Sequence, residues 1–225
     1  MRRMEIAFKN EEEMNEEIQE EMQEVKEAQE KKETGMSEMD FMELLMREIE
    51  SKTLNIMGNF DDNMVKYVRQ FAGQLWYYDG DDTRPLFINI TSHGGQICSL
   101  MAILDILESL KEEWGCRIIA NVNGYAESCG AVLFCYADER YMNRFSEIMI
   151  HEISYGINST LSDHVTELKR SQYLQDIIDE ILCEKTPLTK KLLRKWYKEG
   201  DKFLNRTECE KLGLLTMDNE KEENE

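Results

Sequence analysis

The chain has 225 residues and a formal net charge of −19, from 46 Asp and Glu against 27 Lys and Arg. This length suits one domain with a sizeable core, and so acidic a chain would repel phosphates, which argues against nucleic-acid binding. No apolar run is long enough to span a membrane, and no secretory signal follows the two N-terminal arginines. We therefore expect a cytoplasmic protein with no nucleic-acid or membrane partner.

The six cysteines include no Cys-x-x-Cys pair, and the three histidines do not cluster with them. Several of these cysteines lie in apolar runs, which is typical of buried free thiols in a reducing compartment. A zinc site would need clustered thiolate or imidazole ligands. The sequence therefore predicts neither a metal site nor a cofactor.

Charge divides the chain into three parts. Residues 1–40 carry 14 acidic and 6 basic side chains, so we expect residues 1–36 to be an acidic extension, either solvated and disordered or a helix that docks on a partner. We expect a folded domain over 37–217 and an acidic disordered tail over 218–225. An apolar stripe at helical spacing favours the docking alternative; its members are Met14, Ile18, Met22 and Val25.

Within the expected domain, hydrophobic periodicity and turn signals predict alternating helices and strands. Such alternation predicts an α/β layered fold. The expected helices are 39–48, 61–79, 96–113, 128–137, 161–184 and 188–198, and the expected strands are 53–57, 85–90, 116–122 and 148–151. Helix 161–184 has more apolar surface than one small domain covers, which predicts an oligomer; this surface comprises Tyr173, Leu174, Ile177, Ile178, Ile181 and Leu182.

Chemically suggestive residues follow three of the expected strands. Gly94 and Gly95 offer backbone N–H groups that we expect to be free, Ser128 lies at a strand-to-helix turn, and His151 ends a strand. Asp201 lies fifty residues further on. Oxyanion donors, nucleophile, base and orienting carboxylate thus occur in chain order, as a serine hydrolase requires.

Each of these residues also has a simpler structural interpretation. Ser128 could be a helix N-cap, His151 a hydrogen-bonded histidine at a strand end, and Asp201 a surface aspartate. His93, in the glycine turn, could be a turn residue or a substrate contact. His164 lies in a polar helical stretch, where we expect it to face solvent.

The motifs around these residues resemble those of the proteolytic subunit of the Clp protease, the ClpP family, over roughly residues 43–217. The family reads Asn-Ser-Pro-Gly-Gly at the glycines, Gly-x-Ala-Ala-Ser-Met-Gly/Ala at the nucleophile, Met-Ile-His-Gln at the base and Arg-Asp-x-Phe-Leu-Ser at the acid. The corresponding segments here are 90–95, 124–130, 149–152 and 200–205, and the chain then continues with 208–214, which resembles Glu-Ala-x-x-Tyr-Gly-Leu.

The resemblance implies a role for each matching residue. Ser128, His151 and Asp201 would form the catalytic triad, and the backbone N–H groups of Gly95 and Cys129 would form the oxyanion hole. The implied substrate-binding residues are Gly94, Tyr155, Gly156 and Ile157.

The chain also departs from the family pattern near the nucleophile. His93 stands where the family has proline, Glu127 replaces a small residue, and Cys129 replaces methionine. Segment 155–159 replaces a more glycine-rich stretch that borders bound peptide in the family. We therefore expect substrate preference or ring packing to differ from typical members.

The implied fold is the ClpP/crotonase-type spiral of strand-strand-helix repeats, with 161–184 as a projecting handle helix. The implied function is a self-compartmentalised serine endopeptidase, a heptameric ring, single or stacked in pairs, that cleaves peptides and unfolded proteins. A Clp-type ATPase unfoldase is the implied partner of an ATP-dependent enzyme. Alternatives are a phage-encoded head-maturation protease of the same chemistry, a crotonase-type acyl-CoA enzyme, and an inactive ring subunit or scaffold.

Overall fold

The computed structural model describes residues 38–79, 84–156, 158 and 160–216. The expected extension 1–36, the tail 218–225 and Ile157 lie outside these residues. The chain divides into two compact units, Met1–Glu48 and Ile49–Glu225. Helix α2 (Glu38–Ser51) crosses this boundary and overlaps the helix expected over 39–48.

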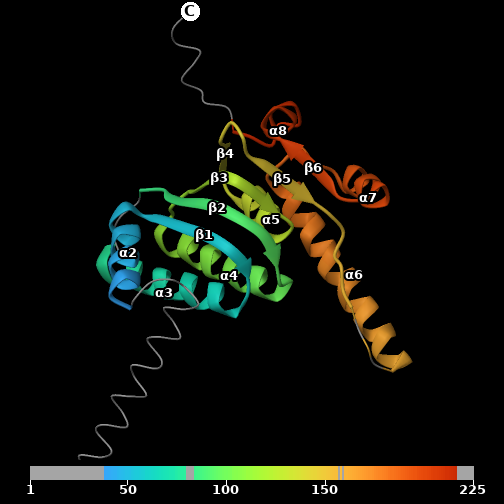
Figure 1. Cartoon of the computed structure of the whole chain (residues 1–225), viewed down its shortest axis with the longest axis horizontal. Coiled ribbons are helices and arrows are strands. Elements are labelled where there is room, and N and C mark those ends of the chain that lie inside the picture. The colour runs from blue at the N-terminus through green and yellow to red at the C-terminus, as the bar shows by residue number, and fades with distance from the viewer. Residues whose placement is uncertain (1–37, 80–83, 157, 159, 217–225) are drawn as a thin grey trace, which may run out of the picture. The chain divides into compact units, whose positions relative to one another are not determined.

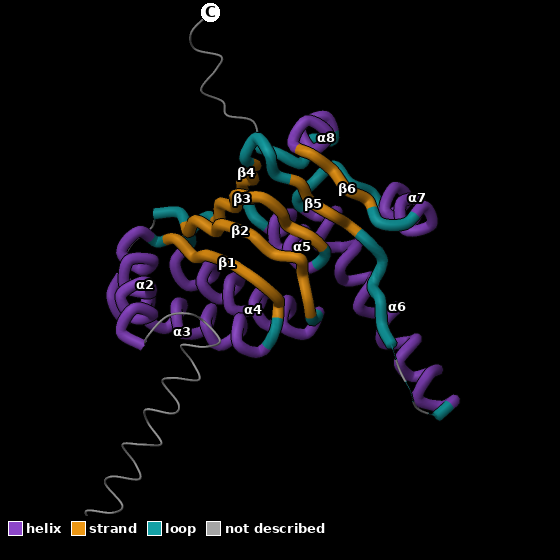
Figure 2. The backbone as a smooth tube through the Cα atoms, in the orientation of Figure 1, coloured by secondary structure: helices purple, strands orange, loops and turns teal. Residues whose placement is uncertain are grey.

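One sheet of six strands organises the second unit (Figures 1 and 2). The order is β1-β2-β3-β5-β6, and β4 also pairs with β3. All pairs are parallel except β5 with β6. The strands are β1 (Thr53–Phe60), β2 (Leu86–Gly95), β3 (Ile118–Glu127), β4 (Glu139–Met142), β5 (Glu147–Ile150) and β6 (Lys202–Asn205).

Helices cover one face of this sheet, which confirms the α/β class expected from the sequence (Figure 1). The connecting helices are α3 (Asp62–Asp79), α4 (Ile97–Trp114), α5 (Cys129–Tyr136), α6 (Leu161–Glu184), α7 (Lys190–Glu199) and α8 (Arg206–Lys211). Of the helices in the described ranges, none is both long and apolar enough to cross a membrane.

The core lies between the sheet and α3, α4 and α5. Strand residues that alternate along β1, β2 and β3 are fully buried against these helices, as the period of two in a strand requires. Several of the alternate positions carry polar side chains on the opposite face, where Asn89 donates to Asn55 at 2.9 Å. The buried set comprises Leu54, Ile56, Ile88, Ile90, Ala120 and Val122.

Helix α6 begins and ends where the sequence predicts. Its first turn is fixed by a capping box, in which Thr160 accepts from the Asp163 backbone N–H and Asp163 accepts from that of Thr160. The apolar surface expected over 173–182 is only partly open, because Ile178 and Leu182 are buried within the chain. The apolar surface that this helix leaves uncovered is therefore smaller than the sequence suggests, with Tyr173 exposed and Leu174, Ile177 and Ile181 half-buried.

Three strands run further than the sequence suggests. Strand β1, expected over 53–57, continues through Phe60. Strand β2 continues through Gly95, although residues 92–95 read as a turn, and β3 continues through Glu127. Strands β4 and β6 and helix α8 were not predicted at all. Each has only four to six residues, too few for a hydrophobic period to become visible.

Candidate active site

Ser128 occupies a constrained turn between β3 and α5. Its backbone lies at φ 52° and ψ −116°, and among the described non-glycine residues only Lys52 also has a positive φ. Such a conformation costs about 1–3 kcal/mol and persists only when neighbouring contacts fix it. Here the Ser128 N–H donates to the Met149 carbonyl at 2.8 Å, and the Ser128 carbonyl accepts from Val132 at 3.1 Å. The turn therefore holds the side chain in one direction.

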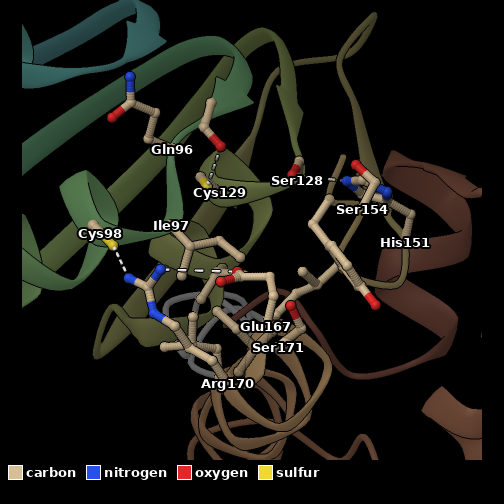
Figure 3. A pocket seen from close by; sticks show the side chains of 16 residues that line it. Gln96, Ile97, Cys98, Ser128, Cys129, His151, Ser154, Glu167, Arg170 and Ser171 are labelled. Carbon is tan, nitrogen blue, oxygen red and sulfur yellow. Dashed lines mark hydrogen bonds and ion pairs between the residues drawn. The ribbon is translucent and has the colours of Figure 1, made fainter. Parts of the chain in front are cut away.

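The hydroxyl of Ser128 contacts an imidazole. His151 Nε2 lies 2.8 Å from Ser128 Oγ, as the dashed line in Figure 3 marks. Strand β5 brings them together, because it pairs in parallel with β3 and ends at Ile150, directly before His151. Ser128 makes no side-chain cap with α5, although it occupies the N-cap position. Its oxygen is thus placed for proton transfer to a neutral histidine.

The glycine turn lies directly against the nucleophile turn. Gly94 has φ 96°, and a Cβ added there would lie 2.6 Å from the Ser128 Cβ. A Cβ on Gly95 would lie 2.5 Å from the Phe60 carbonyl oxygen. Glycine is therefore required at both positions, for backbone approach as well as for a positive φ.

One expectation about this turn was wrong. The Gly94 N–H is not free, because it donates to Ser92 Oγ at 3.0 Å. The fully buried Ser92 hydroxyl in turn donates to the Gly58 carbonyl. This small network fixes the glycine turn to β1, and it removes Gly94 as an oxyanion donor.

Cys129 is the first residue of α5, and its thiol is not placed to act as a nucleophile. The thiol is buried and donates to the Gly95 carbonyl at 3.4 Å. Burial raises the pKa of Cys129 to about 11, because the thiolate would lose its hydration. The reactive thiolate is therefore scarce near neutral pH, and the backbone N–H is the group that this residue can offer a substrate.

Asp201 lies near His151 in the fold but does not bond to it. The last pair of the antiparallel β5–β6 ladder is Ile150 with Lys202, so His151 and Asp201 are the next residues beyond it on each side. Asp201 is exposed, and among the described residues no hydrogen bond joins its carboxylate to the histidine. Ser128 and His151 are therefore in hydrogen-bond contact, whereas Asp201 is not hydrogen-bonded to His151.

A cavity of about 440 Å³ opens beside Ser128 and His151. Tyr155 lines it, whereas Gly156 does not, and Ile157 is outside the described residues. Its walls combine apolar side chains from α4, α5, α6 and the segment after β5 with polar groups (Figure 3). The apolar side chains include those of Ile97, Val132, Ile153, Leu174 and Ile178.

Sequence reasoning missed the charged pair in this cavity. Arg170 on α6 lies 3.8 Å from Glu167 Oε1 and donates to Cys98 Sγ at 3.2 Å (Figure 3). The Glu-x-x-Arg spacing places both side chains on one helix face and was the only signal available. Among the residues described, no group of three His, Cys, Asp or Glu is placed to hold a metal ion.

Comparison with known families agrees with this geometry. Residues 33–217 match the model of the Clp protease family, described as "Clp protease". The match covers 185 of the 225 residues and includes β1 to α8 with Ser128 and His151. It supports a ClpP-type fold and a peptidase, that is, a hydrolase. The chain therefore belongs to the Clp protease family.

Proposed function

We propose that this chain is a self-compartmentalised serine endopeptidase in which Ser128 is the nucleophile, His151 the general base and Asp201 the residue that orients the base. The observation that carries the proposal is the 2.8 Å contact between Ser128 Oγ and His151 Nε2 at a constrained turn. This contact also disfavours the alternative of an inactive ring subunit. None of the residues that the structure describes distinguishes the alternative of a head-maturation protease, which stays a prediction.

The proposed reaction is acyl transfer to serine and then to water. His151 Nε2 takes the hydroxyl proton as Ser128 Oγ bonds to the peptide carbonyl carbon, whose oxygen becomes negatively charged. The backbone N–H groups of Gly95 and Cys129 stabilise that oxyanion. The histidine then gives the proton to the leaving amine, and water, activated by the same base, releases the peptide from the serine.

Asp201 would act through His151. A carboxylate that accepts from Nδ1–H fixes the tautomer in which Nε2 can receive a proton, and stabilises the imidazolium that forms. The antiparallel register supports this role, because it makes Asp201 the neighbour of His151 across the β5–β6 pair. A hydrogen bond from His151 Nδ1–H to the Asp201 carboxylate would complete the proposed triad.

The substrate is proposed to be an extended peptide or unfolded protein. The cavity beside Ser128 has room for one apolar side chain against Val132, Leu174 and Ile178, while Ile153 and Tyr155 lie in a segment without regular secondary structure at its edge. In peptide recognition by strand addition, such a segment pairs with the backbone of an extended peptide. Folded substrates would require an ATPase unfoldase partner, which would make their degradation ATP-dependent.

A serine-reactive fluorophosphonate probe tests the proposed function. The probe is expected to label the full chain at one residue, identified by peptide mass spectrometry as Ser128. The reason is that only a hydroxyl with a base in contact attacks the phosphorus rapidly. Exposed Ser109, whose hydroxyl donates to the Asp105 carbonyl, serves as the internal comparison and should stay unmodified. Absence of label on the folded protein would reject the proposal.

Clp family members typically form oligomeric rings, and we propose a heptameric ring, alone or stacked in pairs, for this chain. The open apolar residues lie towards the N-terminal half of α6, which extends away from the sheet (Figure 1). Their spacing of four and three residues places the first three on one helix face. They are Leu161, Val165 and Leu168, with exposed Tyr173 further along.

Charge on this face should weaken contact between rings. Val165→Asp with Leu168→Asp is expected to lower the mass measured by light scattering, because buried carboxylates without partners oppose association. Thr166→Asp, at an exposed position on a different face of the same helix, is the matched control and should leave the mass unchanged. A wild-type mass of 26.5 kDa at micromolar concentration would contradict the ring itself.

A further inference from the structure

Two departures from the family pattern meet in the structure. His93 directly precedes Gly94, and Glu127 directly precedes Ser128. The two are 34 residues apart, yet His93 Nδ1 lies 2.8 Å from Glu127 Oε2. A side-chain bond therefore joins the glycine turn to the nucleophile turn, two residues before Gly95 and one residue before Ser128.

The sheet holds this pair in a defined place. Strands β2 and β3 are parallel, with Ser92 opposite Ala126, so the following residues, His93 and Glu127, also face each other. The imidazole stacks on Tyr125, with ring centroids 4.1 Å apart and planes 16° apart. Only 17% of the Glu127 side chain is exposed, whereas His93 is 65% exposed. Stacking and partial burial thus restrict both partners of the bond.

The two joined turns must cooperate in the proposed chemistry. One oxyanion donor, Gly95, belongs to the glycine turn, and the other, Cys129, belongs to the nucleophile turn. Gly94 already lies in contact distance of Ser128, as its hypothetical Cβ at 2.6 Å shows. Because no covalent link spans the turns, their spacing depends on such contacts, and misplacement by about 1 Å can lower a rate by about 100-fold.

The identity of residue 93 also affects the spacing between the glycine turn and the nucleophile turn. A proline at position 93 would have its own φ fixed near −65° by its ring. His93 has no such restraint, but its imidazole can bond across to the neighbouring strand. A small residue at position 127 could not receive that bond, whereas the Glu127 carboxylate does.

We propose that His93 and Glu127 are positioning residues, a cross-strand clamp that keeps the oxyanion donors of the glycine turn in register with Ser128. This inference rests on the proposed function and deepens it. A side-chain hydrogen bond with an exposed partner adds little to global stability. Loss of the clamp is therefore expected to lower the turnover number of the folded enzyme far more than its melting temperature.

Steady-state kinetics on a short fluorogenic peptide provide the first test. His93→Ala and Glu127→Ala are each expected to lower kcat about 10-fold, with KM within about 2-fold, because the clamp acts on transition-state alignment. The double variant should be no slower than either single one, since both remove the same bond. His93→Asn should recover most of the rate, because its amide N–H can replace Nδ1–H.

A matched control lies on the same face of the same strand. Asn89→Ala removes the Asn89–Asn55 bond, another cross-strand pair four residues before His93, without touching either turn. Its kcat should equal that of the wild type. Independent, multiplying effects of the two clamp variants would overturn the proposal. A raised KM with unchanged kcat in the His93→Ala and Glu127→Ala variants would also overturn it, because it would show that these residues contact substrate. An equal loss of kcat in Asn89→Ala would overturn it as well.

Hydrogen exchange separates this inference from the proposed function. In a Ser128→Ala background, His93→Ala should speed amide exchange in both 92–96 and 127–131, relative to Asn89→Ala. Unchanged exchange in either segment would overturn the clamp. If the fluorophosphonate probe failed to label wild-type protein, the proposed function would fail, and the exchange result would still decide whether the two turns are coupled.

Discussion

Ser128→Ala is expected to lower kcat/KM for a short fluorogenic peptide by about 10⁴–10⁶-fold. The substitution removes the oxygen that His151 activates at 2.8 Å and leaves the rest of the cavity in place. The buried Cys129 thiol cannot replace it, because its pKa is raised to about 11 and its hydrogen bond turns it to Gly95. The measurement is initial-rate hydrolysis at equal concentrations of folded protein.

A second substitution at the same position checks that the loss is chemical. Ser128→Gly should be equally inactive but more stable than Ser128→Ala by about 1 kcal/mol, because glycine adopts a φ of 52° without the steric cost that alanine bears. Denaturant unfolding of the two variants measures the difference. Full peptide turnover by either variant would show that another residue is the nucleophile.

Much of the fold could be predicted from local pattern. Strands β1 and β3 are apolar at alternate positions, and α6 carries apolar residues at helical spacing, so their existence was visible in the sequence. Ser128 and His151 stood out because each follows such a strand. Parallel pairing of β3 with β5 then brings the strand ends together, as the sequence interpretation required.

The features that escaped prediction depend on tertiary contacts. Ser92 belongs to a polar tetrapeptide that reads as a turn, yet its hydroxyl is buried and bonded to Gly58, so β2 continues past it. The pairing of His93 with Glu127 follows from the register between β2 and β3, which shifts by an irregularity between Ile90 and Ser92. No local pattern encodes a shift of this kind.

The position of Asp201 at the site also depends on a tertiary contact that the local sequence does not reveal. Its position beside His151 depends on β6, a strand of four residues whose pairing with β5 no local period reveals. The motif match identified the residue, but the hydrogen bond that its proposed role needs is a matter of geometry at the start of β6. Motif order thus predicted the candidate groups better than it predicted their contacts.

Gly94→Ala is expected to lower kcat/KM by about 100-fold or more, even when rates are expressed per folded molecule. The new methyl group would lie 2.6 Å from Ser128 Cβ and 2.9 Å from the Glu127 carbonyl oxygen, closer than these atoms can approach. Relief of that overlap must move the nucleophile turn away from the glycine turn. Hydrolysis of the short peptide, normalised by circular dichroism to the folded fraction, measures the effect.

Gly124→Ala separates this displacement from simple backbone strain. Gly124 has φ 88°, close to the 96° of Gly94, but a Cβ there would meet no atom within 4 Å. Both variants should therefore lose about 1 kcal/mol or more of unfolding free energy, because alanine tolerates a positive φ poorly. Only Gly94→Ala should also lose activity per folded molecule. Equal activity of the two variants would mean that the contact between Gly94 and Ser128 does not set the position of the nucleophile.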